Sequence, residues 1–336
     1  MGKASKDKRD IYYRKAKEEG WRARSAFKLL QIDEVFDIFS GVRHAVDLCA
    51  APGSWSQVLS RKLYLPAVAA GDPDPPKIVS VDLQPMAPIE GVIQLQGDIT
   101  SEATAREVIE QFQGQHADLI ICDGAPDVTG LHDLDQYVQL QLILAALTVV
   151  SHVLRPGGSF VAKIFRGKDI NLMYSQLRVF FSEVFCAKPR SSRNSSIEAF
   201  VVCRGYATPP GFQPSALRSL LAGAAEQHEE QQQAYQADPI MRLAVPFLAC
   251  GDLSGWDADR NYALDEAPPA AAAAAAPQEG AGIGSSSSSG YVSLDPVQPP
   301  TAPAYKTAME LVKRQQQQPH AQQQPQQQQQ QQPQPL

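Results

Sequence analysis

Residues 44–55 read HAVDLCAAPGSW, and the architecture of the chain can be worked out from this stretch. A short apolar segment, 44–48, leads directly into a turn at Gly53 and then into a helical segment from Trp55 to Leu63. That succession predicts a buried strand, a tight turn and a helix. The turn lacks the three glycines of a dinucleotide-binding loop. A ligand without phosphates needs less: one glycine, helix-terminal N–H groups and nearby carboxylates.

The alternation of strands and helices continues beyond this turn. Further strands are expected at 78–83, 92–95, 118–122, 159–165, 184–187 and 199–203, and helices at 103–112, 134–154 and 172–181. Elements alternating at these lengths predict an α/β fold, with a seven-stranded, mostly parallel sheet and helices on both faces. Ligands of such sheets bind beyond the carboxyl ends of the strands.

Composition sets bounds on the class of protein. The chain has 336 residues, is 43% hydrophobic and contains no uninterrupted run of about eighteen apolar residues that would span a membrane. Its five cysteines form no CxxC pair and mostly lie in apolar segments, as expected for thiols buried in a protein of a reducing compartment. The six histidines are scattered, so no metal site is expected. These features predict a soluble cytoplasmic protein.

Charge and composition divide the chain into four regions. Residues 1–30 carry ten Lys/Arg and four Asp/Glu, a net charge of +6 in a chain whose total is −6. We therefore expect 1–40 to form a basic helical arm that grips a polyanion such as a nucleic acid locally, with Arg22, Arg24 and Lys28 on its basic face; a solvated or disordered leader is the alternative. Residues 41–206 would form the catalytic domain and 207–264 a C-terminal extension. The Ala, Ser and Gln tracts of 265–336 predict a largely disordered tail, with a docking segment at 291–314.

Carboxylates recur near the ends of the predicted strands. Asp47, Asp82, Asp98 and Asp123 would surround the glycine turn. A single acid after a strand is more often a cap or turn residue. Together they suit S-adenosylmethionine, with Asp82 accepting ribose hydroxyls, Asp98 near the adenine amino group and Asp123 near the sulfonium.

Two lysines and two acids stand out as candidates for catalysis: Lys28, Asp123, Lys163 and Glu198. Lys163 lies inside an apolar strand, where a lysine is costly unless it is paired or functional. A neutral Lys163 would take the proton of a ribose 2′-hydroxyl. The plainer alternatives are a lysine at a sheet edge for Lys163, a cap for Glu198 and a phosphate contact for Lys28.

Four segments carry a family resemblance: DLCAAPGSWSQVL, DGAPD, LRPGGSFVAKIFRG and KPRSSRNSSIEAF. They resemble the FtsJ-like RNA 2′-O-ribose methyltransferases, which have a Rossmann-like S-adenosylmethionine-dependent fold. The resemblance implies a catalytic tetrad of Lys28, Asp123, Lys163 and Glu198. It also implies cofactor contacts at Gly53, Trp55, Asp82, Asp98 and Asp123.

Further segments are similar to the eukaryotic cytoplasmic tRNA branch of this family. That similarity implies methylation of anticodon-loop riboses, at nucleotides 32 and 34, with a WD-repeat and a helical-repeat partner docking on 246–264 and 291–314. The insert 67–77, read as a surface loop, and the low-complexity tracts depart from the family pattern. A ribosomal RNA methyltransferase of the same family and a non-catalytic RNA-binding scaffold are the alternatives.

Overall fold

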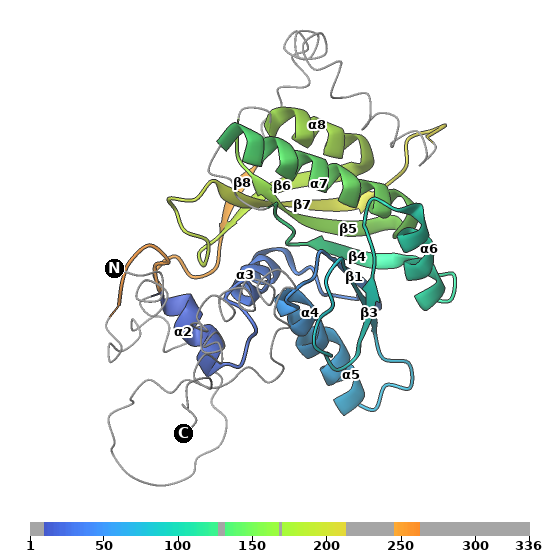
Figure 1. The fold of residues 1–336 in the computed structure, drawn as a ribbon, viewed down its shortest axis with the longest axis horizontal. Coiled ribbons are helices and arrows are strands. Elements are labelled where there is room, and N and C mark those ends of the chain that lie inside the picture. The colour runs from blue at the N-terminus through green and yellow to red at the C-terminus, as the bar shows by residue number, and fades with distance from the viewer. Residues whose placement is uncertain (1–9, 127–131, 168–169, 213–244, 263–336) are drawn as a thin grey trace, which may run out of the picture. The chain divides into compact units, whose positions relative to one another are not determined.

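The computed structural model describes residues 10–126, 132–167, 170–212 and 245–262. One sheet runs through this part of the chain, in the order β3-β2-β1-β4-β5-β7-β6-β8 (Figure 1). Its strands are β1 (His44–Leu48), β2 (Lys77–Asp82), β3 (Val92–Gln96), β4 (Ala117–Cys122), β5 (Leu154–Phe165), β6 (Phe181–Pro189), β7 (Glu198–Tyr206) and β8 (Phe247–Cys250).

Strand direction agrees with the predicted α/β class. β1 pairs in parallel with β2 and β4, β2 with β3, β4 with β5 and β6 with β8, whereas β7 runs antiparallel to both β5 and β6. The strand order reverses between β1 and β4. The turns that follow these two strands therefore meet at the position where open α/β sheets bind ligands.

Helices cover both faces of the sheet, because side chains of each strand alternate between two cores. Val46 of β1 and Ile120 of β4 belong to one core, with α6 (Glu102–Gln111), α7 (His132–Val153) and α8 (Ile170–Phe180). Ala45 and Ile121 belong to the other. That second face is covered by α2 (Ile11–Glu18), α3 (Ala26–Phe36) and α4 (Ser54–Leu59) (Figure 1).

Helix α7 is apolar enough, over Leu134–Val153, to cross a bilayer by length and composition alone. More than half of that window, 56%, is buried inside the protein, and residues such as Ala146, Val150 and Val153 are fully covered. α7 therefore has the burial of a core helix that packs on β5.

The predicted count of seven strands is wrong by one. The eighth strand, β8, comes from the C-terminal extension and pairs with β6, with Cys186 opposite Phe247 and Pro189 opposite Cys250. Four residues are too few for the sequence pattern to separate such an edge strand from a loop. The catalytic sheet thus continues into a region that we expected to dock a partner.

The aromatic anchors of that region are internal to the protein. Trp256 and Tyr262 are 6% and 8% exposed, and their rings meet edge to face with centroids 4.4 Å apart. The Tyr12 hydroxyl of α2 donates a hydrogen bond to the Trp256 carbonyl, at 3.2 Å. These two rings are therefore covered by the chain itself, whereas Phe247 and Leu253 are exposed, and docking of a partner on 246–264 stays a prediction. The second expected docking segment, 291–314, lies outside the described residues.

Two smaller expectations were also tested. The helix predicted from Trp55 continues through a π-helical segment (Ser60–Tyr64) into α5 (Leu65–Ala69), so the insert 67–77 begins as helix and only then becomes a loop. All five cysteines are free thiols, and all but Cys49 are buried, as predicted.

Candidate active site

The Gly53 turn lies between β1 and α4 and demands a glycine. Gly53 has a φ of 98°, in the left-handed region that favours glycine, and a Cβ there would lie 2.4 Å from Nη1 of Arg22. The guanidinium of Arg22 donates hydrogen bonds to the carbonyls of Pro52, Ala87 and Pro88, each at 2.9 Å. Arg22 thus fastens the turn to the segment that follows β2.

The expectation that Arg22 contacts RNA is contradicted by this position. The residue is 7% exposed, and burial lowers the pKa of its guanidinium. Arg22 lies in the connection between α2 and α3, so the helical periodicity that put it on a basic face does not apply there. Its role here is to brace the turn.

Asp82 and Asp98 lie at the ends of neighbouring strands. Asp82 is the last residue of β2, and its carboxylate accepts hydrogen bonds from the backbone N–H of Ala51, at 2.8 Å, and of Gln84, at 2.7 Å. Asp98 is exposed just beyond β3, and one of its oxygens accepts from the N–H and hydroxyl of Thr100. A carboxylate has about four acceptor positions. Both residues therefore keep capacity for a ligand while shaping their turns.

Asp47 is the unusual acid of the group, because it is fully buried within β1. The Ser56 hydroxyl donates to its Oδ2 at 2.5 Å, whereas Oδ1 has no hydrogen-bond partner. Burial raises the pKa of Asp47 to about 8. The hydrogen bond from Ser56 opposes this shift, and the negative charges of Asp123 and Asp82 add to it. Asp47 thus lies near the carboxyl end of β1, as the sequence pattern predicted, but its carboxylate is buried and accepts from Ser56 of α4.

Trp55 also differs from the expected ligand contact. Its side chain is 2% exposed, its indole N–H donates to the Ser25 carbonyl at 2.9 Å, and its ring lies 5.6 Å from that of Phe200. The side chain therefore packs between the start of α3 and β7. Any contact of Trp55 with a ligand would come from its backbone at the start of α4.

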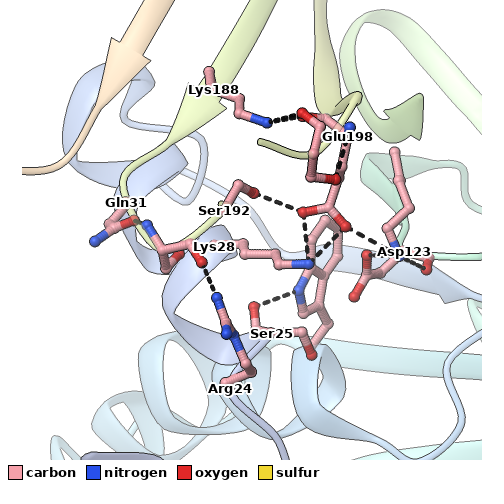
Figure 2. Close-up of polar contacts among 12 residues, drawn as sticks. Arg24, Ser25, Lys28, Gln31, Asp123, Lys188, Ser192 and Glu198 are labelled. Carbon is pink, nitrogen blue, oxygen red and sulfur yellow. Dashed lines mark hydrogen bonds and ion pairs between the residues drawn. The ribbon is translucent and has the colours of Figure 1, made fainter. Parts of the chain in front are cut away.

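Four residues from four separate elements meet in one chain of ionic contacts. Lys28 Nζ lies 2.8 Å from the Glu198 carboxylate, and Lys163 Nζ lies 2.7 Å from Asp123 Oδ1 and 3.9 Å from Glu198 Oε2. Lys163 also donates to the Asp123 carbonyl at 2.9 Å. Lys28 comes from α3, Asp123 follows β4, Lys163 lies in β5 and Glu198 opens β7. Figure 2 shows Lys28, Asp123 and Glu198 of this group. The structure thus brings together the four residues predicted to carry the chemistry.

Electrostatics make this cluster charged at rest. Burial alone would lower the pKa of Lys163, but Asp123 and Glu198 outweigh it and raise that pKa above its ordinary value. Burial would likewise raise the pKa of Glu198, but Lys28, Lys163 and a hydrogen bond from Ser192 lower it to about 2. Lys163 therefore rests as an ammonium between two carboxylates, whereas the sequence suggested a neutral amine.

Sequence reasoning missed three residues that hold this cluster. The Ser192 hydroxyl donates to Glu198 Oε1 at 2.6 Å, and Lys188 donates to the carbonyls of Ser196 and Glu198 (Figure 2). Gln139 of α7 donates to the carbonyls of Gly124, at 3.1 Å, and Lys163, at 2.8 Å. Two features of the sequence could have indicated them: Lys188 near the end of an apolar strand and Gln139 inside an apolar helix.

Arg24 lies at the outer margin of the same cluster. Its guanidinium pairs with Asp10, the N-cap of α2, and donates to the Ser191 carbonyl, while Gln31 of α3 accepts from the Ser191 N–H at 2.9 Å. Arg24 therefore joins the N-terminal helices to the loop before β7. Within the described ranges, no group of three or more His, Cys, Asp or Glu side chains could hold a metal ion.

The site thus has two sides that meet at Lys163 and Asp123. We call Asp47, Gly53, Asp82 and Asp98 the turn side, since they surround the turns after the first strands. We call the other group the loop side, since it gathers around the loop 190–197 between β6 and β7; it comprises Arg24, Lys28, Ser192, Arg193 and Glu198. The turn side offers carboxylates and backbone, and the loop side offers mainly cations and hydroxyls.

Comparison with known proteins agrees with this arrangement. The FtsJ-like methyltransferase family matches residues 21–206. The chain is 57% identical over 316 residues to a mouse tRNA (cytidine(32)/guanosine(34)-2′-O)-methyltransferase, covering 94% of this chain and 88% of the mouse protein. It is 52% identical over 314 residues to the Schizosaccharomyces pombe protein of the same description, covering 93% and 98%. An AdoMet-dependent rRNA methyltransferase of Neurospora crassa is 40% identical over 232 residues, which cover 68% of this chain and 27% of that protein.

The family match spans β1 to β7 and includes all four residues of the ionic cluster. The sequence motifs, the strand order and the meeting of Lys28, Asp123, Lys163 and Glu198 are consistent with it. This chain belongs to the FtsJ-like methyltransferase family.

Proposed function

We propose that this enzyme transfers a methyl group from S-adenosylmethionine to ribose 2′-hydroxyls at nucleotides 32 and 34 of the tRNA anticodon loop. The observation that carries the proposal is Lys163 of β5, held between Asp123, which follows β4, and Glu198, which opens β7. The names and the near-complete coverage of the mouse and fission yeast relatives support the choice of tRNA.

The turn side suits S-adenosylmethionine. Asp82 and Asp98 retain acceptor positions for ribose hydroxyls and the adenine amino group, Gly53 gives the turn its left-handed backbone, and Asp47 has an unpartnered buried oxygen. The bound molecule would supply an electrophilic methyl on a sulfonium, whose positive charge close to Lys163 would favour the neutral amine.

The residues around Lys163 suit proton transfer from a hydroxyl. Asp123 fixes the amine through both its carboxylate and its carbonyl, at 2.7 and 2.9 Å. Glu198 remains ionised because its pKa is lowered to about 2. Once Lys163 has lost its own proton, it accepts that of the 2′-hydroxyl, while the oxygen takes the methyl group. Because the resting pKa of Lys163 is raised, the rate should increase with pH across the neutral range.

Two alternatives are disfavoured by specific observations. The Neurospora rRNA methyltransferase matches this chain over only 27% of its own length, whereas the S. pombe tRNA enzyme matches over 98%. A scaffold would gain nothing from the nearly buried Lys163, which is 9% exposed, because charges in that position are costly to desolvate.

The decisive experiment is methylation of tRNA by Lys163→Met. We expect a loss of about 10²–10⁴-fold in kcat, because the proton acceptor is removed. Ribose-methylation mapping of tRNA would measure it, with S-adenosylmethionine affinity followed by calorimetry and expected to change little.

Lys163→Arg is the matched control, since it keeps the positive charge beside Asp123 but cannot serve as a base at ordinary pH. Activity close to wild type in either variant would exclude Lys163 as the base. Methylation of ribosomal RNA but not tRNA by the wild type would exclude the proposed substrate.

We also propose WD-repeat and helical-repeat partners and a cytoplasmic location, on the strength of the resemblance to the tRNA branch. Exposed Phe247 and Leu253 are the apolar side chains of 245–262 that such a partner could cover. Affinity capture of the full chain and of Phe247→Ser/Leu253→Ser, with microscopy of a fluorescent fusion, would test both. Capture of neither class of partner, or a fusion confined to another compartment, would contradict the respective proposal.

A further inference from the structure

A cavity of about 250 Å³ lies on the loop side, next to the ionic cluster. It is lined by Arg24, Lys28, Ser192, Arg193, Ser196 and Glu198. A water molecule in the liquid occupies roughly 30 Å³, so the cavity has room for a group much larger than one water. Figure 2 shows Arg24, Lys28, Ser192 and Glu198 gathered in this region.

Positive charge is in excess around the cavity. Arg24 and Arg193 both contact Asp10, whose side chain is 5% exposed, so one carboxylate serves two guanidinium groups. With Lys28, Lys163 and Lys188 there are five cationic side chains. The carboxylates of the same network are Asp10, Asp123, Glu198 and Asp259, the last of which accepts hydrogen bonds from the loop. The excess is one positive charge. In the lining itself three cations, Arg24, Lys28 and Arg193, face one carboxylate, which favours an anionic ligand.

Hydrogen bonding in the cavity also favours an anion. Glu198 is the carboxylate in the lining, and its oxygens already accept from Lys28 and Ser192. The Ser196 hydroxyl oxygen accepts from the Glu198 N–H at 3.1 Å, which leaves its O–H able to donate. The lining therefore presents donors to a ligand, as a phosphate oxygen requires.

The position of the cavity identifies which anion. Glu198 lies between the two lysines, 2.8 Å from Lys28 Nζ and 3.9 Å from Lys163 Nζ, so the cavity is one side chain away from the proposed base. In ribonucleic acid the 2′-hydroxyl and the 3′-phosphate are on adjacent carbons of one ribose. We infer that this cavity binds the phosphodiester on the 3′ side of the ribose to be methylated, an inference that rests on the proposed function. Arg24 and Arg193 are then positioning residues for the RNA.

The test uses an anticodon stem-loop RNA in which a neutral methylphosphonate replaces the linkage 3′ to the target ribose. With wild-type enzyme we expect about a tenfold loss of kcat/KM on this RNA. Arg193→Ala should lose about tenfold on the unmodified RNA, mainly in KM, and show a salt dependence smaller by about one ion. Because the methylphosphonate and Arg193→Ala remove the same contact, the kcat/KM of Arg193→Ala should be little lower on the methylphosphonate RNA than on the unmodified RNA.

Three controls separate the outcomes. Arg155→Ala removes the same charge at the start of β5, where Arg155 pairs with Asp118 near the amino ends of β5 and β4, away from the site, and should behave as wild type. Arg193→Lys should recover part of the loss, and a methylphosphonate in the stem should have no effect. If Arg193→Ala and the methylphosphonate lower kcat/KM independently, so that their factors multiply, the cavity assignment would be overturned. An Arg193→Ala enzyme with wild-type kcat/KM would overturn it too. Neither result would affect the proposed function. Wild-type enzyme that fails to methylate the unmodified RNA would overturn the proposed function and this assignment with it.

Discussion

The turn side and the loop side of the active site are built in different ways. On the turn side, the hydrogen bond from the Ala51 N–H to the Asp82 carboxylate joins residues 31 positions apart, in consecutive strand–turn units. On the loop side, Lys28 and Glu198 are 170 positions apart, and Tyr12 and Trp256 are 244 apart. The turn side, where we propose that the cofactor binds, is thus encoded locally, whereas the loop side depends on three distant segments that must pack together.

The largest effect that would separate the two sides is expected from Trp256→Ala. Trp256 packs against Tyr262 and joins the core that contains α2 and α3. Removing its ring should lower the free energy of unfolding by about 3–5 kcal/mol and loosen 245–262. Transfer to tRNA should fall further than affinity for S-adenosylmethionine, because the turn side has no contact with this segment among the described hydrogen bonds. Denaturant unfolding and calorimetry would measure the two effects.

Trp256→Phe is the conservative control and should lose much less stability and much less transfer to tRNA. An equal loss of cofactor affinity and tRNA transfer in Trp256→Ala would show that the two sides are one cooperative unit.

A smaller effect, of opposite sign, is expected on the turn side from Asp47→Asn. The pKa of Asp47 is raised from 3.8 to about 8, so the native state keeps a proton that the unfolded chain releases above pH 4. The free energy of unfolding of the wild type therefore falls as the pH rises from about 4 to about 8, and above pH 8 this loss of stability is complete. Asp47→Asn carries an amide, which does not ionise, so its free energy of unfolding near pH 7 should exceed that of the wild type by on the order of 2–4 kcal/mol.

Unfolding curves between pH 4 and pH 8 would measure this gain, which should vanish toward the acid end. Asp82→Asn, at a partly exposed carboxylate, is the comparison variant. A gain for Asp47→Asn that does not change with pH would contradict the assignment of a buried, protonated acid.

Prediction from the sequence worked where local order determines structure. The stretch 44–55 was enough for β1, the turn and α4, and the strand ends that follow it gave Asp82 and Asp98 their positions. It failed where a helical period was continued through residues 19–25, which are not helical, and so placed Arg22 on the surface. β8 and the buried Trp256 were missed because their partners, β6 and α2, are remote in sequence. The pairing energy of such segments cannot be read from local pattern.

The smallest effect, and the finest test of the loop side, is expected from Asp259→Ala. The Asp259 carboxylate accepts hydrogen bonds from the Asn194 N–H, at 2.6 Å, and from the Ser195 hydroxyl, at 2.9 Å. It thereby fixes the loop that supplies Ser192 and Arg193. Because Asp259 is exposed, its removal should cost only about 1 kcal/mol of stability. The looser loop should raise KM for tRNA several-fold and leave KM for S-adenosylmethionine unchanged.

Asp252→Ala provides a matched loss of charge in the same segment. The Asp252 carboxylate accepts from the N–H and hydroxyl of Ser254 within its own turn, so it shapes 252–255 without reaching the loop. Steady-state kinetics of both variants on one tRNA would therefore separate a general effect of acidic charge from a specific hold on residues 194–195. Equal KM values for tRNA in the two variants would mean that the C-terminal segment supports the fold without positioning the acceptor, and that β6, β7, α3 and the α2 cap Asp10 hold the loop side in place.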